Sequence, residues 1–197
     1  MRIYAVIDTN VIVSSMLTRN SLSPTKEMLV TVRDKVVVPM INADIMEEYK
    51  EVLSRSKFRF ASEDIDNILR LFDTAGEIFI PESIGRDFVD MNDVIFYETY
   101  LMRPDSYLVT GNLRHFPSEP RILSPFDMIS IVHLVEDGKR DVLNERSGVY
   151  LSETMCRAWE SVERMRASAV ANGIADMSME EINEEIRQYR EEKRNRG

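Results

Sequence analysis

Short apolar runs alternate with segments of helical periodicity over about the first two thirds of the chain, and this alternation constrains the fold most. Residues 3–7 form a β-rich run of the kind found in strands buried on both faces. Similar runs occupy residues 36–38, 77–80, 106–109 and 121–123. Apolar residues three or four positions apart mark helical segments at residues 25–33, 43–55, 62–75, 90–102 and 125–135. This alternation predicts an α/β fold with a central, mostly parallel sheet flanked by helices.

The C-terminal part of the chain has a different pattern, with two amphipathic helical segments and no strand. A charged, glycine-containing stretch precedes it. Gly173 is placed to end the first helix, and Ser178 with Glu181 forms a capping-box pattern at the start of the second. We therefore predict a domain at residues 1–137, a connector at 138–151 and a helical extension at 152–197.

Charge and cysteine usage exclude several classes of protein. The formal net charge is -9, from 34 acidic and 25 basic residues, which argues against binding nucleic acid through bulk positive charge. The single cysteine forms no internal disulfide or thiolate cluster and suggests a reducing compartment. The first apolar stretch is interrupted by Asp8 and Asn10 and resembles no export signal, and no apolar run spans a bilayer. We expect a cytoplasmic protein without a membrane partner.

Asp8 directly follows the first predicted strand, so its carboxylate is expected at the carboxyl edge of the sheet. A charge at such a place is costly unless it is paired, hydrogen-bonded or bound to a cation. Thr9 and Asn10 either hold this carboxylate or begin the next helix. A structural role as a helix N-cap and a functional role are both open for Asp8.

Further polar residues occur at corresponding places along the chain. Asp90 and Asp93 open one predicted helix, where acidic residues also have a structural role through the helix dipole. Glu47 and Glu48 lie about 100° apart on another predicted helix, so at most one faces a shared cleft. Converging carboxylates repel one another, and oxygen ligands without cysteine favour Mg²⁺ or Mn²⁺. Such a site activates water for hydrolysis of a phosphodiester.

Four segments, in order, resemble PIN-domain ribonucleases. They are residues 6–13 with Asp8-Thr-Asn, 45–53, 90–96, and 108–117 with Thr110-Gly-Asn112. The last is close to the PIN subgroup (VapC-like) found as toxins of bacterial and archaeal toxin–antitoxin pairs. The resemblance covers about residues 1–135. It implies a three-layer PIN-like fold and a Mg²⁺- or Mn²⁺-dependent endoribonuclease that cleaves RNA.

Carried over by position, the resemblance implies metal ligation and catalysis by Asp8, Glu48 and Asp93. We prefer Glu48 to Glu47 because an aromatic residue follows it, as an apolar residue follows the acid in the family. Asn112 completes the catalytic set at a position where many members have a fourth acid. Secondary positions are Asp90, Thr110 and Asn10.

The two histidines have different expected roles. His115 either contacts substrate or supports the turn beside Phe116, and the structural role is the default. His133 falls within an apolar helical stripe and is expected in the core.

The last helix suggests regulation. From residue 178 it resembles the C-terminal part of antitoxins that accompany such toxins, and Arg187, Arg190 and Arg194 fall on one face at i, i+3 and i+7. Guanidinium groups match carboxylates and could displace a cation. We predict that these arginines cover the acidic site of the same or a neighbouring subunit and inhibit it. An ordinary amphipathic terminal helix is the alternative. A homodimer or higher oligomer suits the resemblance, and a separate antitoxin is an open possibility.

Two other functions fit parts of this pattern. A phosphatase with an aspartate nucleophile wants a second aspartate two residues on, where this chain has Asn10. A non-enzymatic alternative is stronger: a catalytically weak or inactive PIN-like module with a regulatory or assembly role in a toxin–antitoxin system.

Overall fold

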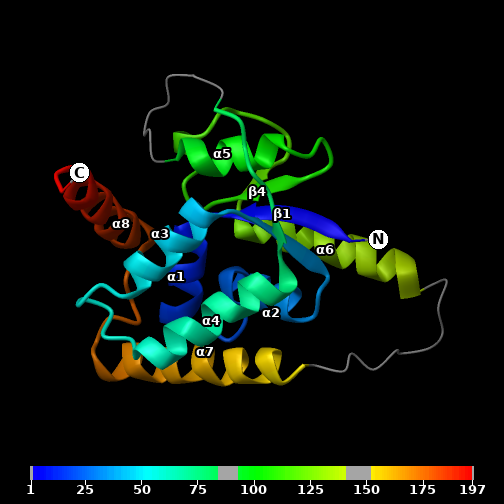
Figure 1. Ribbon diagram of the computed structural model, residues 1–197. Coiled ribbons are helices and arrows are strands. Elements are labelled where there is room, and N and C mark those ends of the chain that lie inside the picture. Colours follow the sequence, from blue (N-terminus) through cyan, green and yellow to red (C-terminus); the bar gives the residue numbers. More distant parts are fainter. Residues whose placement is uncertain (1, 84–92, 141–151, 197) are drawn as a thin grey trace.

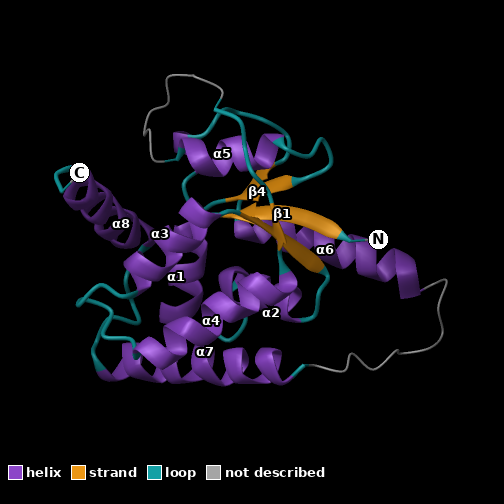
Figure 2. Ribbon diagram, in the orientation of Figure 1, coloured by secondary structure: helices purple, strands orange, loops and turns teal. Residues whose placement is uncertain are grey.

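A fully parallel, five-stranded sheet lies at the centre of the computed structural model, which describes residues 2–83, 93–140 and 152–196 (Figure 2). The strand order is β3-β2-β1-β4-β5. The strands are β1 (Ile3–Ile7), β2 (Val37–Ile41), β3 (Glu77–Ile78), β4 (Tyr107–Val109) and β5 (Ile122–Leu123). The predicted α/β class is confirmed.

Helices cover both sides of this sheet, with α5 on one side and α1, α2 and α4 on the other (Figure 1). The helices are α1 (Thr9–Leu17), α2 (Pro24–Arg33), α3 (Ala43–Leu53), α4 (Ser62–Ala75), α5 (Val94–Leu101), the 3₁₀ turn η1 (Leu113–His115), α6 (Pro125–Arg140), α7 (Glu153–Ala171) and α8 (Met179–Arg194). None of the helices in these described ranges is both long and apolar enough to cross a membrane.

The central strand β1 fixes the position of the first polar residue after it. Ala5 pairs in register with Pro39 of β2 and with Tyr107 of β4, and the backbone N–H of Asp8 still donates to the carbonyl of Val109 at 2.9 Å. Apolar burial on both faces selects small and branched residues here, such as Val6, which is fully buried. Asp8 and the residues that follow β4 therefore meet at one edge of the sheet.

The C-terminal helices pack on the same chain. The predicted apolar stripe of α7 is buried against α4 and α1, through Met155, Val162, Met165 and Ala169. Gly173, which follows the C-cap residue Asn172 of α7, has a φ of 71°, a conformation that glycine adopts without strain. The capping box of Ser178 and Glu181 is present, and α8 then runs beside α3 and α1 (Figure 1).

Element boundaries differ modestly from those expected. The helix predicted at 90–102 is described as α5 from Val94, and residues 90–92 lie outside the described part of the chain. Asp8 does begin a helix, because α1 starts at Thr9. The expectation for His133 is wrong: its side chain is exposed and its Nε2 lies 2.7 Å from Glu27 Oε1. The apolar stripe of α6 faces α2, and His133 lies at its outer edge.

Candidate active site

Asp8 is held at the end of β1 by three hydrogen bonds. Its side chain caps α1 by accepting from the backbone N–H of Asn10 at 3.3 Å, so the structural role considered for it is real. It also accepts from Asn10 Nδ2 at 2.8 Å and from Thr110 Oγ1 at 2.6 Å. A carboxylate that only capped a helix would not need the last two contacts, which fix its orientation toward the sheet edge.

Glu48 reaches the same edge from α3 because it occupies the buried stripe of that helix. Its buried neighbours Ile45, Tyr49 and Val52 follow the i, i+3, i+4, i+7 spacing. The carboxylate accepts from Thr9 Oγ1 at 2.6 Å, which joins it to the start of α1. Glu47, one position earlier, points outward and is exposed.

Asp93 brings a third carboxylate to the cluster from the start of α5. Its side chain makes no capping hydrogen bond to that helix. Instead, Asp93 Oδ2 lies 2.9 Å from Nδ1 of His115, the last residue of η1. Asp90, the secondary acid of the same motif, lies outside the described residues.

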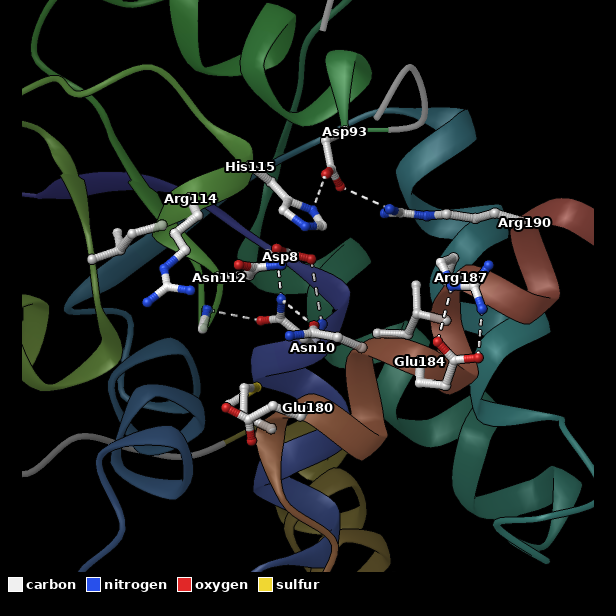
Figure 3. A pocket seen from close by; sticks show the side chains of 15 residues that line it. Asp8, Asn10, Asp93, Asn112, Arg114, His115, Glu180, Glu184, Arg187 and Arg190 are labelled. Atoms are coloured by element: carbon white, nitrogen blue, oxygen red, sulfur yellow. Dashed lines mark hydrogen bonds and ion pairs between the residues drawn. The ribbon is translucent and has the colours of Figure 1, made fainter. Parts of the chain in front are cut away.

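Arg190 of α8 inserts its guanidinium between Glu48 and Asp93, and Figure 3 shows its contact with Asp93. Its Nη1 donates to Asp93 Oδ1 at 2.7 Å, while Nη2 and Nε donate to Glu48 at 2.9 and 3.2 Å. Arg190 is only 6% exposed, and Asp8, Glu48 and Asp93 are 3%, 7% and 2% exposed. A buried cluster of three acids is thus matched by a buried cation from the same chain.

The polar residues after β4 complete the site. Asn10 Oδ1 accepts from the backbone N–H of Gly111 at 2.9 Å, and Thr110 Oγ1 accepts from the backbone N–H of Asn112 at 2.9 Å. Asn10 Nδ2 also donates to Asn183 Oδ1 of α8 at 3.0 Å. Sequence reasoning missed Asn183, since nothing in its local pattern points to the sheet edge.

The other two arginines of the predicted inhibitory face do not contact the acids in the same way. Arg187 lines the pocket next to the cluster but forms ion pairs with Glu184 and Glu191 of its own helix. Arg194 is exposed at the end of α8. Of the three, the structure brings Arg190 into contact with the carboxylates.

Electrostatics distinguish the members of the cluster. The pKa of Asp8 is raised from 3.8 to about 6, first by burial and then by the charge of Asp93, while the charge of Arg190 opposes both. Burial lowers the pKa of Arg190, but the charges of Glu48 and Asp93 prevail and hold that pKa above its ordinary value. The guanidinium therefore stays charged, while Asp8 is the acid whose ionisation the buried site opposes.

This pKa predicts a pH dependence of stability. The folded-state pKa of Asp8 exceeds its unfolded value, so its contribution is fully present below pH 3.8 and is lost as pH rises through about 6. The difference between the two values corresponds to about 2–3 kcal/mol. In EDTA, the free energy of unfolding of the unaltered chain should fall by that amount, relative to Asp8→Asn, between about pH 4 and pH 7. Urea unfolding at both pH values measures it; parallel behaviour of the two proteins would contradict it.

A pocket of about 570 Å³ opens beside the cluster. Asp8, Asn10, Asp93, Asn112 and His115 line one wall, and α8 lines the other with Met179, Asn183 and Arg190 (Figure 3). His115 is the functional candidate that sequence reasoning undervalued. Its place three residues after Asn112, at the carboxyl edge of the sheet, was the available signal.

The carboxylates suit a hard divalent cation by their chemistry. With α8 docked, however, they surround a guanidinium. Within the described ranges, no group of three or more Asp, Glu, His or Cys residues is arranged so that it could hold a metal ion. In the docked state, the positive charge next to these carboxylates is the guanidinium of Arg190.

Comparison with known proteins identifies the family. No curated protein and no solved structure matches the chain significantly. The family model described as "PIN domain" matches residues 4–114, more than half of the 197 residues, and this range contains all three carboxylates. The chain therefore belongs to the PIN-domain family, whose members are in general nucleases.

Proposed function

We propose that the protein is a metal-dependent endoribonuclease of the toxin–antitoxin type whose site is inhibited by its own α8. The observation that carries this proposal is the buried contact of Arg190 with Glu48 and Asp93, beside Asp8. Three acids that converge from β1, α3 and α5 make no contribution to folding that apolar residues could not make better. Their convergence is explained by a function that needs a cation.

With α8 displaced, Asp8, Glu48 and Asp93 would hold Mg²⁺ or Mn²⁺. A bound cation supplies activation of water and neutralisation of charge on the phosphodiester. The chain's own residues orient the ligands: Thr110 fixes Asp8, and Thr9 fixes Glu48 through its 2.6 Å hydrogen bond. Asn112 adds an amide at the pocket wall without adding a fourth negative charge.

The buried face of α8 is shorter than that of α7 and carries a larger share of charged side chains, which favours α8 as the displaceable helix. The buried face of α7 is mainly apolar. The buried face of α8 combines Ile182, Ile186 and Tyr189 with the charged side chains of Glu185 and Arg190. Glu185 pairs with Arg55 at 2.6 Å and Lys57 at 2.9 Å. Ions compete with the charged part of the α8 contact, whereas exposing the apolar stripe of α7 costs roughly 25 cal/mol per Å² of apolar surface.

Further ion pairs continue this pattern along the same face of α8. Lys193 lies 2.6 Å from Glu47 and 3.3 Å from Glu51, and the hydroxyl of Tyr189 donates to Glu51. The charges of α8 thus match those of α3 and of the residues that follow it, Arg55 and Lys57. This complementarity supports a docked, inhibitory helix; assembly as a homodimer and a separate antitoxin stay predictions.

The alternative is a catalytically weak or inactive PIN module. Two observations favour it: Asn112 stands where a fourth acid is usual in the resemblance, and the acids of the described chain are arranged around Arg190 and not for a metal. Metal binding and cleavage separate this alternative from the nuclease.

Removal of α8 tests the proposal. A chain of residues 1–177 keeps α7 and should cleave single-stranded RNA with Mn²⁺ about tenfold or more faster than the full chain, since it loses the competing guanidinium. EDTA should abolish the cleavage. A chain of residues 1–194, which keeps α8, is the matched control and should behave as the full chain.

Folding of the shortened chain is checked by circular dichroism and by the fluorescence of Trp159, the single tryptophan. Its ring on α7 lies 4.5 Å from the Arg33 guanidinium of α2 and reports the docking of α7. A folded 1–177 chain without metal-dependent cleavage would favour the inactive module.

A further inference from the structure

His115 stands between the acid cluster and the open part of the pocket. Its Nδ1 lies 2.9 Å from Asp93 Oδ2, yet 37% of its side chain is exposed. The ring lies below Asp93, on the side of the pocket where Asp8 and Asn10 also lie (Figure 3). One edge of the imidazole is thus fixed by an acid of the site, and the rest of the ring faces the space that a substrate would enter.

The fixed edge determines what the other nitrogen can do. An ionised carboxylate only accepts hydrogen bonds, so the nitrogen facing Asp93 carries the hydrogen. In its neutral form, a ring held in this tautomer presents Nε2 as an acceptor. Among the hydrogen bonds of the described residues, the ring is engaged through Nδ1, and none involves Nε2. The pocket wall therefore offers a hydrogen-bond acceptor with a defined orientation.

The backbone of a nucleic acid contains few groups that could donate to this acceptor. Phosphate oxygens and the ring oxygen of the sugar accept only, whereas the 2′-hydroxyl of RNA donates and accepts, and DNA lacks it. Bases also carry donors. However, a phosphodiester approaching Asp8 and Asp93 through a cation would place its sugars, and not its bases, next to the acids.

We propose that Nε2 of His115 accepts a hydrogen bond from the 2′-hydroxyl of a nucleotide adjoining the cleaved phosphodiester, and that this contact makes the site prefer RNA to DNA. The inference rests on the proposed nuclease function and names its specificity-determining residue. His115 would position Asp93 through Nδ1 and bind the 2′-hydroxyl of the sugar through Nε2.

Arg114 provides a matched comparison on the same turn. It is exposed and lines the pocket next to His115. A guanidinium there would contact phosphates, which are the same in RNA and DNA. Arg114→Ala should therefore weaken the use of all nucleic acids alike, whereas a change at His115 should alter the response to the sugar.

Single-atom changes in the substrate test the proposal. The protein is the full chain carrying Arg190→Ala, and the substrate is a short RNA in which one nucleotide at a time is 2′-deoxy or 2′-fluoro. One substitution next to the cleavage site should lower kcat/KM by about 3- to 10-fold, the value of one hydrogen bond. The 2′-fluoro sugar keeps the RNA-like pucker without a donor, so it should behave as 2′-deoxy.

Variants at His115 and Arg114 test which side chain contacts the sugar. His115→Asn places an amide near the position of Nδ1 and nothing at Nε2, so it should keep Mn²⁺ affinity and lose the sensitivity to 2′-deoxy and 2′-fluoro. His115→Ala should lose both. Arg114→Ala should keep the sensitivity while its kcat/KM falls on every substrate.

Two results would overturn the inference: a 2′-fluoro substrate cleaved as well as RNA, or His115→Asn as sensitive to 2′-deoxy as its parent. Binding of the same oligonucleotides by fluorescence anisotropy, with Ca²⁺ in place of Mn²⁺, gives the comparison without cleavage. If Mn²⁺ supports no cleavage by any variant but binding in Ca²⁺ still discriminates the sugars through His115, the nuclease function is wrong and the sugar contact is supported.

Discussion

Replacing Arg190 by alanine is expected to raise Mn²⁺-dependent RNA cleavage by about 10- to 100-fold, the range of typical coupling between two competing ligands of one site. The guanidinium occupies Glu48 and Asp93 at 2.7–3.2 Å, and a cation needs the same oxygens. Other contacts of α8, such as Glu185 with Arg55, remain in this variant. The change therefore removes the competitor without removing the helix.

The same variant should be less stable without metal. Removing one partner of a buried ion pair costs about 3–5 kcal/mol, because the remaining charges are left uncompensated. Mn²⁺ binds the folded state alone and should restore much of this loss, about 2.7 kcal/mol at one hundred times its Kd. Thermal unfolding with EDTA and with Mn²⁺, together with the rate of RNA cleavage, measures both effects.

Two further variants sharpen the comparison. Arg187→Ala removes a neighbouring charge that forms exposed ion pairs within α8. Because exposed ion pairs contribute little energy, the cleavage rate of this variant should stay within about twofold of the parent. Arg190→Lys keeps the positive charge but loses the bidentate contact with Glu48. Its cleavage rate should therefore lie between those of the parent and of Arg190→Ala. If Arg190→Ala gains neither Mn²⁺ affinity nor activity, the inhibitory role of α8 is wrong.

Replacing Asp8 by asparagine is expected to lower activity without lowering the stability of the metal-free protein. In the Arg190→Ala background, cleavage should fall roughly 10²- to 10³-fold, because a metal ligand contributes several kcal/mol of transition-state stabilisation. Burial opposes the charged form of Asp8, whose pKa is about 6, so the neutral amide should leave the metal-free protein equally stable or more stable at neutral pH. The amide oxygen of the new side chain can still accept from the hydroxyl of Thr110.

Mn²⁺ titration, RNA cleavage and urea unfolding in EDTA check this pair of effects. Asp73→Asn is the matched control, since Asp73 is exposed on α4 and its replacement should alter none of the three. A loss of stability that accompanies the loss of activity would mean that Asp8 is mainly structural, as its N-cap bond to α1 allows. Unaltered Mn²⁺ binding in Asp8→Asn would favour the inactive module.

The helices could be predicted because they depend on local periodicity, whereas Glu48 was preferred to Glu47 from the family resemblance. Glu48 lies on the stripe of Ile45, Tyr49 and Val52, and that spacing alone turns its side chain toward the sheet. The capping box at Ser178 is likewise a short-range pattern, and it formed as predicted. His133 shows the limit of such patterns, since a place at the edge of an apolar stripe does not fix whether a side chain is covered.

By itself, the sequence determined the order of strands and helices, the family, and the acids that follow β1 or lie on α3. These properties follow from hydrogen bonding and burial within a few residues. Only the tertiary structure decided that Arg190, and not Arg187 or Arg194, meets the acids, across separations of 97 and 142 residues. That choice depends on how α8 lies against α3. The direction of His115 depends likewise on Asp93, 22 residues away. Contacts between distant segments are selected by packing and charge complementarity, which no local pattern encodes.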